Sequence, residues 1–317
     1  MRIATLGGIP RALGGGGLER QVRETSAALR RRRHDVRPVA AAEPGGFDVL
    51  HAFGAEPDVC HVLAHWRLTR VPLVVSPVIV VPPRRVAVER LSARVPLSTW
   101  GPRMRRQLLI SADLVVAQSR HEHDLATELG AARVVTVPNG VSREQAGAPP
   151  PGTPTSPYVL LAGSVSRRKR QLETVAALAG LRPVVVGGFE GTAAERVEFQ
   201  RAVADAGGTW LGEVVDRSAL LGLVRDASAL VHLSRAEGQS LAVLEALALG
   251  TPVVASPLPA TVELAAAYPG HVHLADGPSE ARALVQTLPP RPEQPAAVPT
   301  WDDVAARLEP LYESLLR

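Results

Sequence analysis

Short apolar runs and amphipathic stretches alternate along almost the whole chain of 317 residues. The apolar runs contain few polar residues, which is typical of parallel strands that are covered on both faces. The runs predict strands at RIATLGG, DVRPVA, DVLHAF, PLVVSPV, ADLVVAQS, RVVTVPNG, YVLLAGS, PVVVGG, TWLGEV, ALVHLS, PVVAS and HVHLA. The intervening stretches predict helices at GLERQVRETSAALRRRR, DVCHVLAHWRLT, SRHEHDLATELG, RQLETVAALAG, AAERVEFQRAVADAG, RSALLGLVRDA and SLAVLEALALG. This alternation predicts a doubly wound α/β fold.

Two segments rich in proline interrupt the alternation. The first, REQAGAPPPGTPTSP at 143–157, can continue neither a helix nor a central strand, so it predicts an interdomain linker. The second, LPPRPEQPAAVP, precedes a final helix at 300–317. We therefore expect two Rossmann-like domains, at 1–150 and 156–299, facing across a cleft. Ligands bind such domains at the carboxyl ends of the strands.

The bulk composition excludes several classes of protein. No apolar run reaches the roughly 20 residues of a membrane span, and the amino-terminal residues predict a strand and a glycine loop rather than a signal peptide. The single cysteine, Cys60, excludes an internal disulfide and suggests a cytoplasmic protein. A net charge of +4 and 3% aromatic residues argue against nucleic acid as a partner.

One basic residue stands apart from the others. Lys and Arg total 35, yet Lys169 is the only lysine in the chain. So strong a preference for arginine suggests coding bias in the gene. The one lysine that remains, Lys169, therefore marks a position at which an arginine would not perform the same role. Lysine is a compact point charge suited to phosphate oxygens, whereas the arginine fork is larger and planar.

The run SRAEGQSLAVLEALALGTPVVAS, at 234–256, places Glu237 in a turn between a strand and a helix. The amide groups after Gly238 begin that helix, and a helix amino terminus favours anions. Glu245 lies one turn past Leu241 on the same helical face. Phosphates on the amides and sugar hydroxyls on the two carboxylates would make a nucleotide-sugar site. The structural alternative is an amphipathic helix with Glu245 on its solvent face.

The same run resembles the donor-site signature of family four retaining glycosyltransferases with the GT-B fold, a similarity that extends over nearly the whole chain. The signature residues present are Glu237, Glu245, Ala246, Gly250, Pro252, Val253 and Val254. The resemblance implies that Glu237 holds donor-sugar hydroxyls, that the diphosphate binds to Gly238, Gln239, Ser240 and Leu241, and that Glu245 holds the ribose. It also implies that Lys169 contacts the diphosphate, and that neither a metal nor another cofactor is required.

Two positions depart from the family pattern. Ser164 stands where the family carries a phosphate-binding arginine, so Arg167 or Arg168 is expected to replace it. Ser76 and Pro77 stand where the family often carries a histidine near the sugar. His51 also ends a predicted strand, without an established role.

Other candidates carry weaker signals. The glycine loop at 14–17, with Gly16 and Gly17 at the helix start, would let amides approach the donor, or is simply a flexible turn. His61 and His65 have the i, i+4 spacing of metal ligands, but no third ligand supports them, so a surface or packing role is the preferred interpretation.

A basic cluster contains one acidic residue, Glu89, and seven arginines: Arg84, Arg85, Arg90, Arg94, Arg103, Arg105 and Arg106. It predicts a surface for anionic lipid or an anionic acceptor, or a solvated face.

The resulting expectation is a retaining, metal-independent hexosyltransferase that moves a sugar from a nucleoside-diphosphate sugar to an acceptor hydroxyl on a glycan, a lipid-linked molecule or a small molecule. We expect it in the cytoplasm, with a peripheral position at the inner face of the membrane left open. The alternatives are a GT-B partner protein with weak or no activity, favoured by Ser164 and Pro77, and another GT-B enzyme such as a nucleotide-sugar epimerase.

Overall fold

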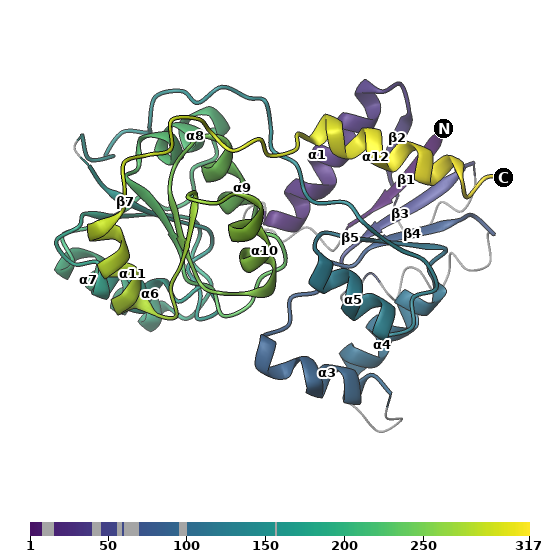
Figure 1. The fold of residues 1–317 in the computed structure, drawn as a ribbon, viewed down its shortest axis with the longest axis horizontal. Helices are drawn as coiled ribbons and strands as arrows, with labels where there is room; N and C mark the ends of the chain where they lie inside the picture. Colours follow the sequence, from purple (N-terminus) through teal and green to yellow (C-terminus); the bar gives the residue numbers. More distant parts are fainter. Residues whose placement is uncertain (8–15, 40–45, 56–58, 60–69, 95–99, 156) are drawn as a thin grey trace. The chain divides into compact units, whose positions relative to one another are not determined.

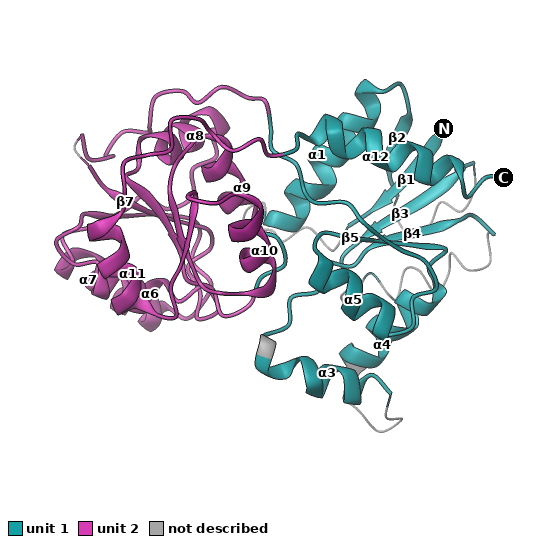
Figure 2. Ribbon diagram, viewed as in Figure 1, with its two compact units in different colours: residues 1–142, 237–239, 299–317 teal, residues 143–236, 240–298 magenta. Residues whose placement is uncertain are grey.

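The computed structural model describes residues 1–7, 16–39, 46–55, 59, 70–94, 100–155 and 157–317. Within these residues the chain forms two compact units, each with its own sheet and helices (Figures 1 and 2). Unit 1 contains residues 1–142, 237–239 and 299–317, and unit 2 contains residues 143–236 and 240–298. The carboxyl-terminal helix thus belongs to the unit that contains the amino terminus.

The sheet of unit 1 has six parallel strands in the order β2-β1-β3-β4-β5-β6. Its strands are β1 Arg2–Leu6, β2 Asp35–Pro38, β3 Val49–Phe53, β4 Leu73–Ser76, β5 Leu114–Ala117 and β6 Val134–Thr136. Its helices are α1 Gly17–Arg31, the 3₁₀ turn η1 Pro83–Arg85, α3 Val86–Ser92, α4 Trp100–Ser111, α5 Arg120–Glu128 and α12 Trp301–Glu313.

The sheet of unit 2 also has six parallel strands, in the order β12-β11-β10-β7-β8-β9. Its strands are β7 Val159–Ala162, β8 Pro183–Val186, β9 Thr209–Trp210, β10 Ala229–His232, β11 Val253–Ala255 and β12 Val272–Leu274. Its helices are α6 Gln171–Ala177, α7 Ala193–Asp205, α8 Arg217–Asp226, α9 Leu241–Ala248, α10 Pro259–Ala267 and α11 Pro278–Thr287.

The apolar runs of the sequence explain which strands are central. Every residue of β3, β4 and β5 is buried, and so is every residue of β7, β8, β10 and β11. The edge strand β2 buries only Val36, and β9 is only partly buried. All the strands predicted from the sequence are present, so the inference of two doubly wound parallel sheets is confirmed. The predicted helix at DVCHVLAHWRLT lies outside the described residues, apart from Val59.

The carboxyl-terminal helix α12 packs on α1 within unit 1. It begins at a capping box, in which Thr300 and Asp303 each bind the other's backbone amide. Trp301 and Tyr312 are almost fully buried. Arg31 pairs with Asp302 at 2.7 Å. The helix is therefore an integral part of unit 1.

The proline-rich segment after Ser142 packs on α8 in unit 2. The amide of Gly147 donates to the carbonyl oxygen of Ser218 at 3.0 Å, and Arg225 donates to the carbonyl oxygen of Ala146 at 2.9 Å. A Cβ on Gly222 would lie 2.4 Å from the carbonyl oxygen of Gly147, so glycine is needed where the segment crosses the helix. The first part of the expected linker is thus fixed to one unit.

Candidate functional site

The sheet of unit 2 reverses its winding at β7 and β10. From β7 the chain adds β8 and β9 on one side, then returns to add β10, β11 and β12 on the other. β7 and β10 are parallel neighbours, with Leu160 opposite Leu230. Open α/β sheets bind ligands outside the carboxyl ends of the two strands at such a switch point. The loops that leave these two ends carry Lys169 and Glu237.

The loop after β7 is held by backbone contacts and one buried amide. Gly163, at φ +127°, receives a hydrogen bond on its carbonyl oxygen from Gln171 Nε2 at 2.9 Å, and Gln171 Oε1 accepts from the amide of Ser166 at 3.1 Å. A Cβ on Gly187 would lie 2.0 Å from the carbonyl oxygen of Gly163. The loop therefore has a fixed path, and Gln171 was not singled out from the sequence.

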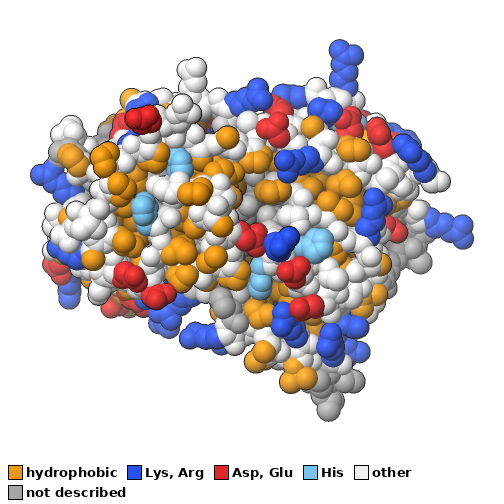
Figure 3. Space-filling model, in the orientation of Figure 1, with side chains coloured by type: hydrophobic (Ala, Val, Ile, Leu, Met, Phe, Trp, Pro, Cys, Tyr) orange, Lys and Arg blue, Asp and Glu red, His pale blue; other side chains and the backbone are white. Residues whose placement is uncertain are grey.

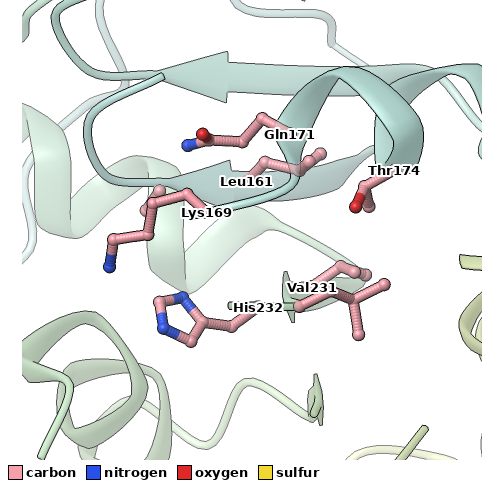
Figure 4. Close-up of a pocket in the computed structure, with 8 residues that line it drawn as sticks. Leu161, Lys169, Gln171, Thr174, Val231 and His232 are labelled. Carbon is pink, nitrogen blue, oxygen red and sulfur yellow. The ribbon is translucent and has the colours of Figure 1, made fainter. Parts of the chain in front are cut away.

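The side chain of Lys169 lies over Gly163. A Cβ added to Gly163 would be 3.6 Å from both Cε and Nζ of Lys169. Lys169 also lines a small cavity of about 10 Å³ together with Gln171, Thr174 and His232. Figure 4 shows Lys169 and His232 converging from the loop after β7 and from the end of β10. The lone lysine thus sits at the switch point, beside the half-buried Ser164.

The two arginines that precede Lys169 point to different places. Arg167 pairs with Glu195 on α7, at 2.7 Å, and its side chain is 94% exposed. Arg168 donates from its guanidinium to the carbonyl oxygen of Ala236 at 3.1 Å, and its own carbonyl oxygen accepts from the amide of Arg235 at 2.8 Å. Arg168 is therefore the arginine that reaches the loop after β10.

The loop after β10 leads into a helix whose first turn has no side-chain cap. Ser240 occupies the N-cap position of α9 in an extended conformation, but its hydroxyl makes no cap hydrogen bond. Ser119, Thr192, Asp216 and Thr300 do cap the helices that follow them. An uncapped helix start presents amide donors and the positive end of the helix dipole. Glu237, Gly238, Gln239 and Ser240 are half-buried, and Leu241 is buried.

Glu245 is buried, so the solvent-face alternative is wrong. Its side chain is 4% exposed. Its carboxylate receives both terminal nitrogens of Arg217, the first residue of α8: Nη1 donates to Oε2 at 3.2 Å, and Nη2 donates to Oε1. Sequence reasoning did not find Arg217, because nothing in the spacing of α8 and α9 indicates that their side chains meet.

Models of two protein families match the chain, and together they cover most of both units. The model described as "Glycosyl transferases group 1" matches residues 156–288, and "Glycosyl transferase 4-like domain" matches residues 38–140. The chain is a group 1 glycosyltransferase. A search of curated proteins with this sequence finds no match.

Solved glycosyltransferase structures share the fold of this group 1 glycosyltransferase. AviGT4, a glycosyltransferase involved in avilamycin A biosynthesis, is 19% identical with a TM-score of 0.65, covering 99% of this chain and 98% of its own. Sucrose-phosphate synthase from Thermosynechococcus elongatus is 17% identical with a TM-score of 0.69, covering 99% of both chains. The pneumococcal O-GlcNAc transferase GtfA, solved with UDP and GlcNAc, is 11% identical with a TM-score of 0.61, covering 85% of this chain and 57% of its own. The fold is GT-B.

In unit 1 of this glycosyltransferase, His51 is a buried packing residue. Its Nδ1 is 2.7 Å from the hydroxyl of Tyr312, its Nε2 is 2.9 Å from Oγ of Ser76, and its ring stacks on Phe53. Burial lowers the pKa of His51 to about 3, so the ring is neutral at physiological pH. The histidine therefore joins β3 and β4 to α12.

The loop after β4, which begins at Pro77, is held by Glu122. The buried carboxylate of Glu122 accepts from the amides of Ile79 at 2.6 Å and Gln118 at 2.7 Å. Burial raises the pKa of Glu122 to about 6, and the two backbone hydrogen bonds oppose that rise. Val78 has φ +48°, which is rare for a β-branched residue. Glu122 thus stabilises a strained backbone.

The glycines at the start of α1 border open space. The amide of Gly16 donates to Glu19 Oε2 at 2.8 Å, and a Cβ on Gly16 or Gly17 would meet nothing within 4 Å. A donor phosphate at the Gly16 amide would therefore have to displace Glu19. Four other candidates of this unit lie outside the described residues or partly so: the first half of the glycine loop at 14–15, and Cys60, His61 and His65.

Among the residues that the structure describes, no helix is long and apolar enough to cross a membrane. No group of three His, Cys, Asp or Glu side chains in the same residues is placed to hold a metal ion.

Proposed function

We propose that this chain transfers a hexosyl group from a nucleoside-diphosphate sugar to an acceptor hydroxyl, with retention at the anomeric carbon and without a metal. The observation that carries the proposal is the position of Lys169, Arg168 and the uncapped start of α9 at one switch point. The retaining outcome is supported by the resemblance of residues 234–256 to the donor signature. GtfA, of the same fold, was solved with UDP.

Charge on the leaving diphosphate is the main electrostatic demand of this reaction. Lys169 and the first amides of α9 would hold the diphosphate and stabilise the negative charge that builds as the glycosidic bond breaks. Arg168 would supply the positive charge that the resemblance leads us to expect at the position of Ser164. These groups lie on fixed loops, so little reorganisation is needed during the reaction. We assign no role to a metal ion, because the side chains of Lys169 and Arg168 are proposed to supply the positive charge beside the diphosphate.

Glu237 and Glu245 would bind the two sugars of the donor. Glu237 precedes the amides and would orient the transferred sugar through its hydroxyls, and Glu245 lies one turn into α9 and would accept from the ribose. We assign the acceptor to unit 1. No residue is assigned as a covalent nucleophile.

The arginine-rich face of unit 1 is proposed as a peripheral contact for anionic lipid or acceptor. Two of its arginines form ion pairs within the unit: Arg90 pairs with Glu128 at 2.5 Å, and Arg105 pairs with Glu89. Arg84, Arg85 and Arg94 are exposed. Val88 and Leu91 of α3 are 59% and 66% exposed beside them. Figure 3 shows apolar and basic side chains together over α3.

Vesicle sedimentation tests that contact. The wild type should bind vesicles of phosphatidylglycerol, not phosphatidylcholine, and lose binding at high salt. The variant Leu91→Ser with Arg84→Ser should bind less. Equal binding to both vesicle types would contradict the proposal.

The proposed reaction is tested with the full chain and a panel of UDP, GDP, ADP and dTDP sugars, by measuring nucleoside diphosphate released with and without pooled acceptors. Release should persist in EDTA, and NMR of the product should show the donor's anomeric configuration. Ser164 favours a second candidate, a partner protein without activity of its own. That candidate predicts binding of a nucleoside diphosphate, seen as a raised melting temperature, with no release from any donor.

A further inference from the structure

Three residues of the loop after β10 belong to unit 1, although the chain on either side of them belongs to unit 2. These residues are 237–239, which include Glu237. Within unit 1 they contact the side chain of Gln118, directly after β5, and Asn139, shortly after the neighbouring strand β6. Gln118 and Asn139 are both buried. The short segment that carries Glu237 therefore packs at the carboxyl ends of β5 and β6.

Gln239 is held by three hydrogen bonds. The backbone amide of Asn139 donates to Oε1 of Gln239 at 2.7 Å, and Nδ2 of Asn139 donates to the carbonyl oxygen of Gln239 at 3.3 Å. The backbone amide of Gln239 donates to Oε1 of Gln118 at 3.4 Å. The backbone of Gln239 and its side-chain oxygen are thus all hydrogen-bonded within unit 1.

Gln118 is itself fixed by other residues of unit 1. Its Nε2 donates to Oε1 of the buried Gln21 on α1 at 2.9 Å, and its backbone amide donates to Oε2 of Glu122 at 2.7 Å. A buried amide that is hydrogen-bonded at both ends keeps its orientation, because turning it would leave polar atoms unpaired. A Cβ on Gly238 would lie 3.3 Å from Oε1 of Gln118, so the glycine leaves room for this side chain.

These contacts restrain the backbone on one side of Glu237. On the other side, the carbonyl oxygen of Ala236 accepts from Arg168 at 3.1 Å. Gly238 separates Glu237 from Gln239, and a glycine gives the backbone more freedom than any other residue. Without the hydrogen bonds to Gln239, the backbone after Glu237 would lose its restraint. A carboxylate that orients a sugar for reaction has to be held in place.

We propose that Gln118 and Asn139 are positioning residues for the donor sugar, because they hold residues 237–239 so that Glu237 meets the sugar hydroxyls. The amide of Gln239 serves this purpose, and the diphosphate is held by groups outside residues 237–239. The inference rests on the proposed function, since it requires Glu237 to bind the sugar. Neither Gln118 nor Asn139 is assigned a contact with the substrate.

The test separates binding of the sugar from binding of the diphosphate. Calorimetry measures the Kd of the donor that the wild type cleaves fastest, among UDP, GDP, ADP and dTDP sugars, and the Kd of its nucleoside diphosphate. Gln118→Met keeps the length of the side chain and deletes both of its hydrogen bonds. The ratio of the donor Kd to the nucleoside diphosphate Kd should rise about tenfold, and kcat should fall by about as much. The affinity for the nucleoside diphosphate alone should stay within about twofold of the wild type.

Three further variants complete the design. Asn139→Ala removes one of the contacts to Gln239 and should change the ratio in the same direction, but less. Gln118→Met combined with Gln21→Met replaces both partners of a buried hydrogen bond by apolar groups, so it should fold and show the same rise in ratio. The matched control is Gln107→Met, at an exposed glutamine of α4 in the same unit. Its ratio and kcat should equal those of the wild type.

Amide hydrogen exchange gives a measurement that does not depend on activity. In the absence of nucleotide, peptides that contain the amide of Gln239 should exchange about tenfold faster in Gln118→Met than in the wild type, because that amide loses its acceptor. Peptides from β8 should exchange at equal rates in the two proteins.

Other outcomes overturn the inference in distinguishable ways. An equal loss of affinity for the donor and for the nucleoside diphosphate means that Gln118 supports the phosphate site or the fold as a whole. Tighter binding of the nucleoside diphosphate in Gln118→Met means that Gln118 competes with the phosphates for the amide of Gln239. Faster exchange with an unchanged ratio and kcat means that Glu237 does not depend on these contacts. A wild type that neither binds nor cleaves any donor overturns the proposed function, and the inference with it.

Discussion

The guanidinium of Arg168 donates to the carbonyl oxygen of Ala236 at 3.1 Å, whereas the neighbouring Arg167 pairs with Glu195. The first contact joins the loop after β7 to the residue before Glu237. The second points away from that loop. The structure thus separates two arginines that the sequence presented as equivalent candidates for the cation that the family resemblance leads us to expect at position 164.

This separation predicts unequal effects on catalysis. Arg168→Ala should lower the rate of nucleoside diphosphate release by about a hundredfold, because a charge that stabilises the leaving group is lost. Arg167→Ala, the matched control, should lie within about twofold of the wild type, since it removes a surface ion pair of small energy. Initial rates at saturating donor measure both. Equal losses in the two variants would contradict the assignment of Arg168.

Lys169→Arg should fail to restore the activity that Lys169→Ala loses. The lysine lies against Gly163 in a confined space, where the wider guanidinium does not reproduce a point charge. We expect both variants to fall by roughly a hundredfold in kcat/KM. Steady-state kinetics with the preferred donor provide the measurement. Wild-type rates in the Lys169→Arg variant would show that an arginine at position 169 performs the same role as the lysine.

Gly187→Ala should destabilise unit 2 by about 2 kcal/mol or more, because its φ of +143° is unfavourable for alanine and the new Cβ would lie 2.0 Å from the carbonyl oxygen of Gly163. Gly188→Ala is the matched control. A Cβ there meets nothing within 4 Å, so the change should stay within about 0.5 kcal/mol. Urea unfolding of the two variants compares them, and similar midpoints would refute the backbone contact.

His51 should make the stability of unit 1 depend on pH. Its pKa is lowered from 6.5 to about 3 in the folded state, so the unfolded chain binds the proton more readily. The stabilisation is full above pH 6.5 and falls as the pH drops toward 3, with about 2 kcal/mol lost by pH 5. His51→Gln should remove this dependence.

The unfolding free energy of the wild type minus that of His51→Gln, measured from pH 7 to pH 5, reports the His51 contribution. Tyr312→Phe is the control, because it deletes one hydrogen bond of His51 but keeps the ring. It should lower stability by about 1 kcal/mol while leaving most of the pH dependence. A pH-independent difference for His51→Gln would show that the imidazole is not buried in the neutral form.

The sequence predicted the strands well, since near-continuous apolar runs such as those of β7 and β10 are a local signal of burial on both faces. The helices α3, α4, α10 and α11 were not predicted from the sequence. α10 begins with a proline at Pro259 and has no amphipathic period, and α3 lies in an arginine-rich stretch that suggested only a charged surface. These helices are stabilised by packing that no local pattern records.

The residues of the candidate site also fall into two groups: those that the sequence reveals and those that only the folded structure brings together. Lys169 and Glu237 could be found because each follows a strand that the pattern reveals, and because one is a lone lysine and the other part of a recognisable run. Arg217 could not be found, because its partner Glu245 lies on another helix and the pair forms only when α8 and α9 pack. Glu122 could not be found for the same reason, since its acceptor role depends on the loop after β4.

The sequence by itself determined the order of strands and helices along the chain, the two-unit architecture and the residues at the strand ends, because these depend on the spacing of apolar residues. Only the tertiary structure decided that β10 lies beside β7, that Arg168 rather than Arg167 reaches the loop before Glu237, and that His51 is a packing residue. The physical reason is that hydrophobic period is a property of neighbours in the chain, whereas hydrogen bonds and ion pairs between side chains depend on which elements the folded core brings together.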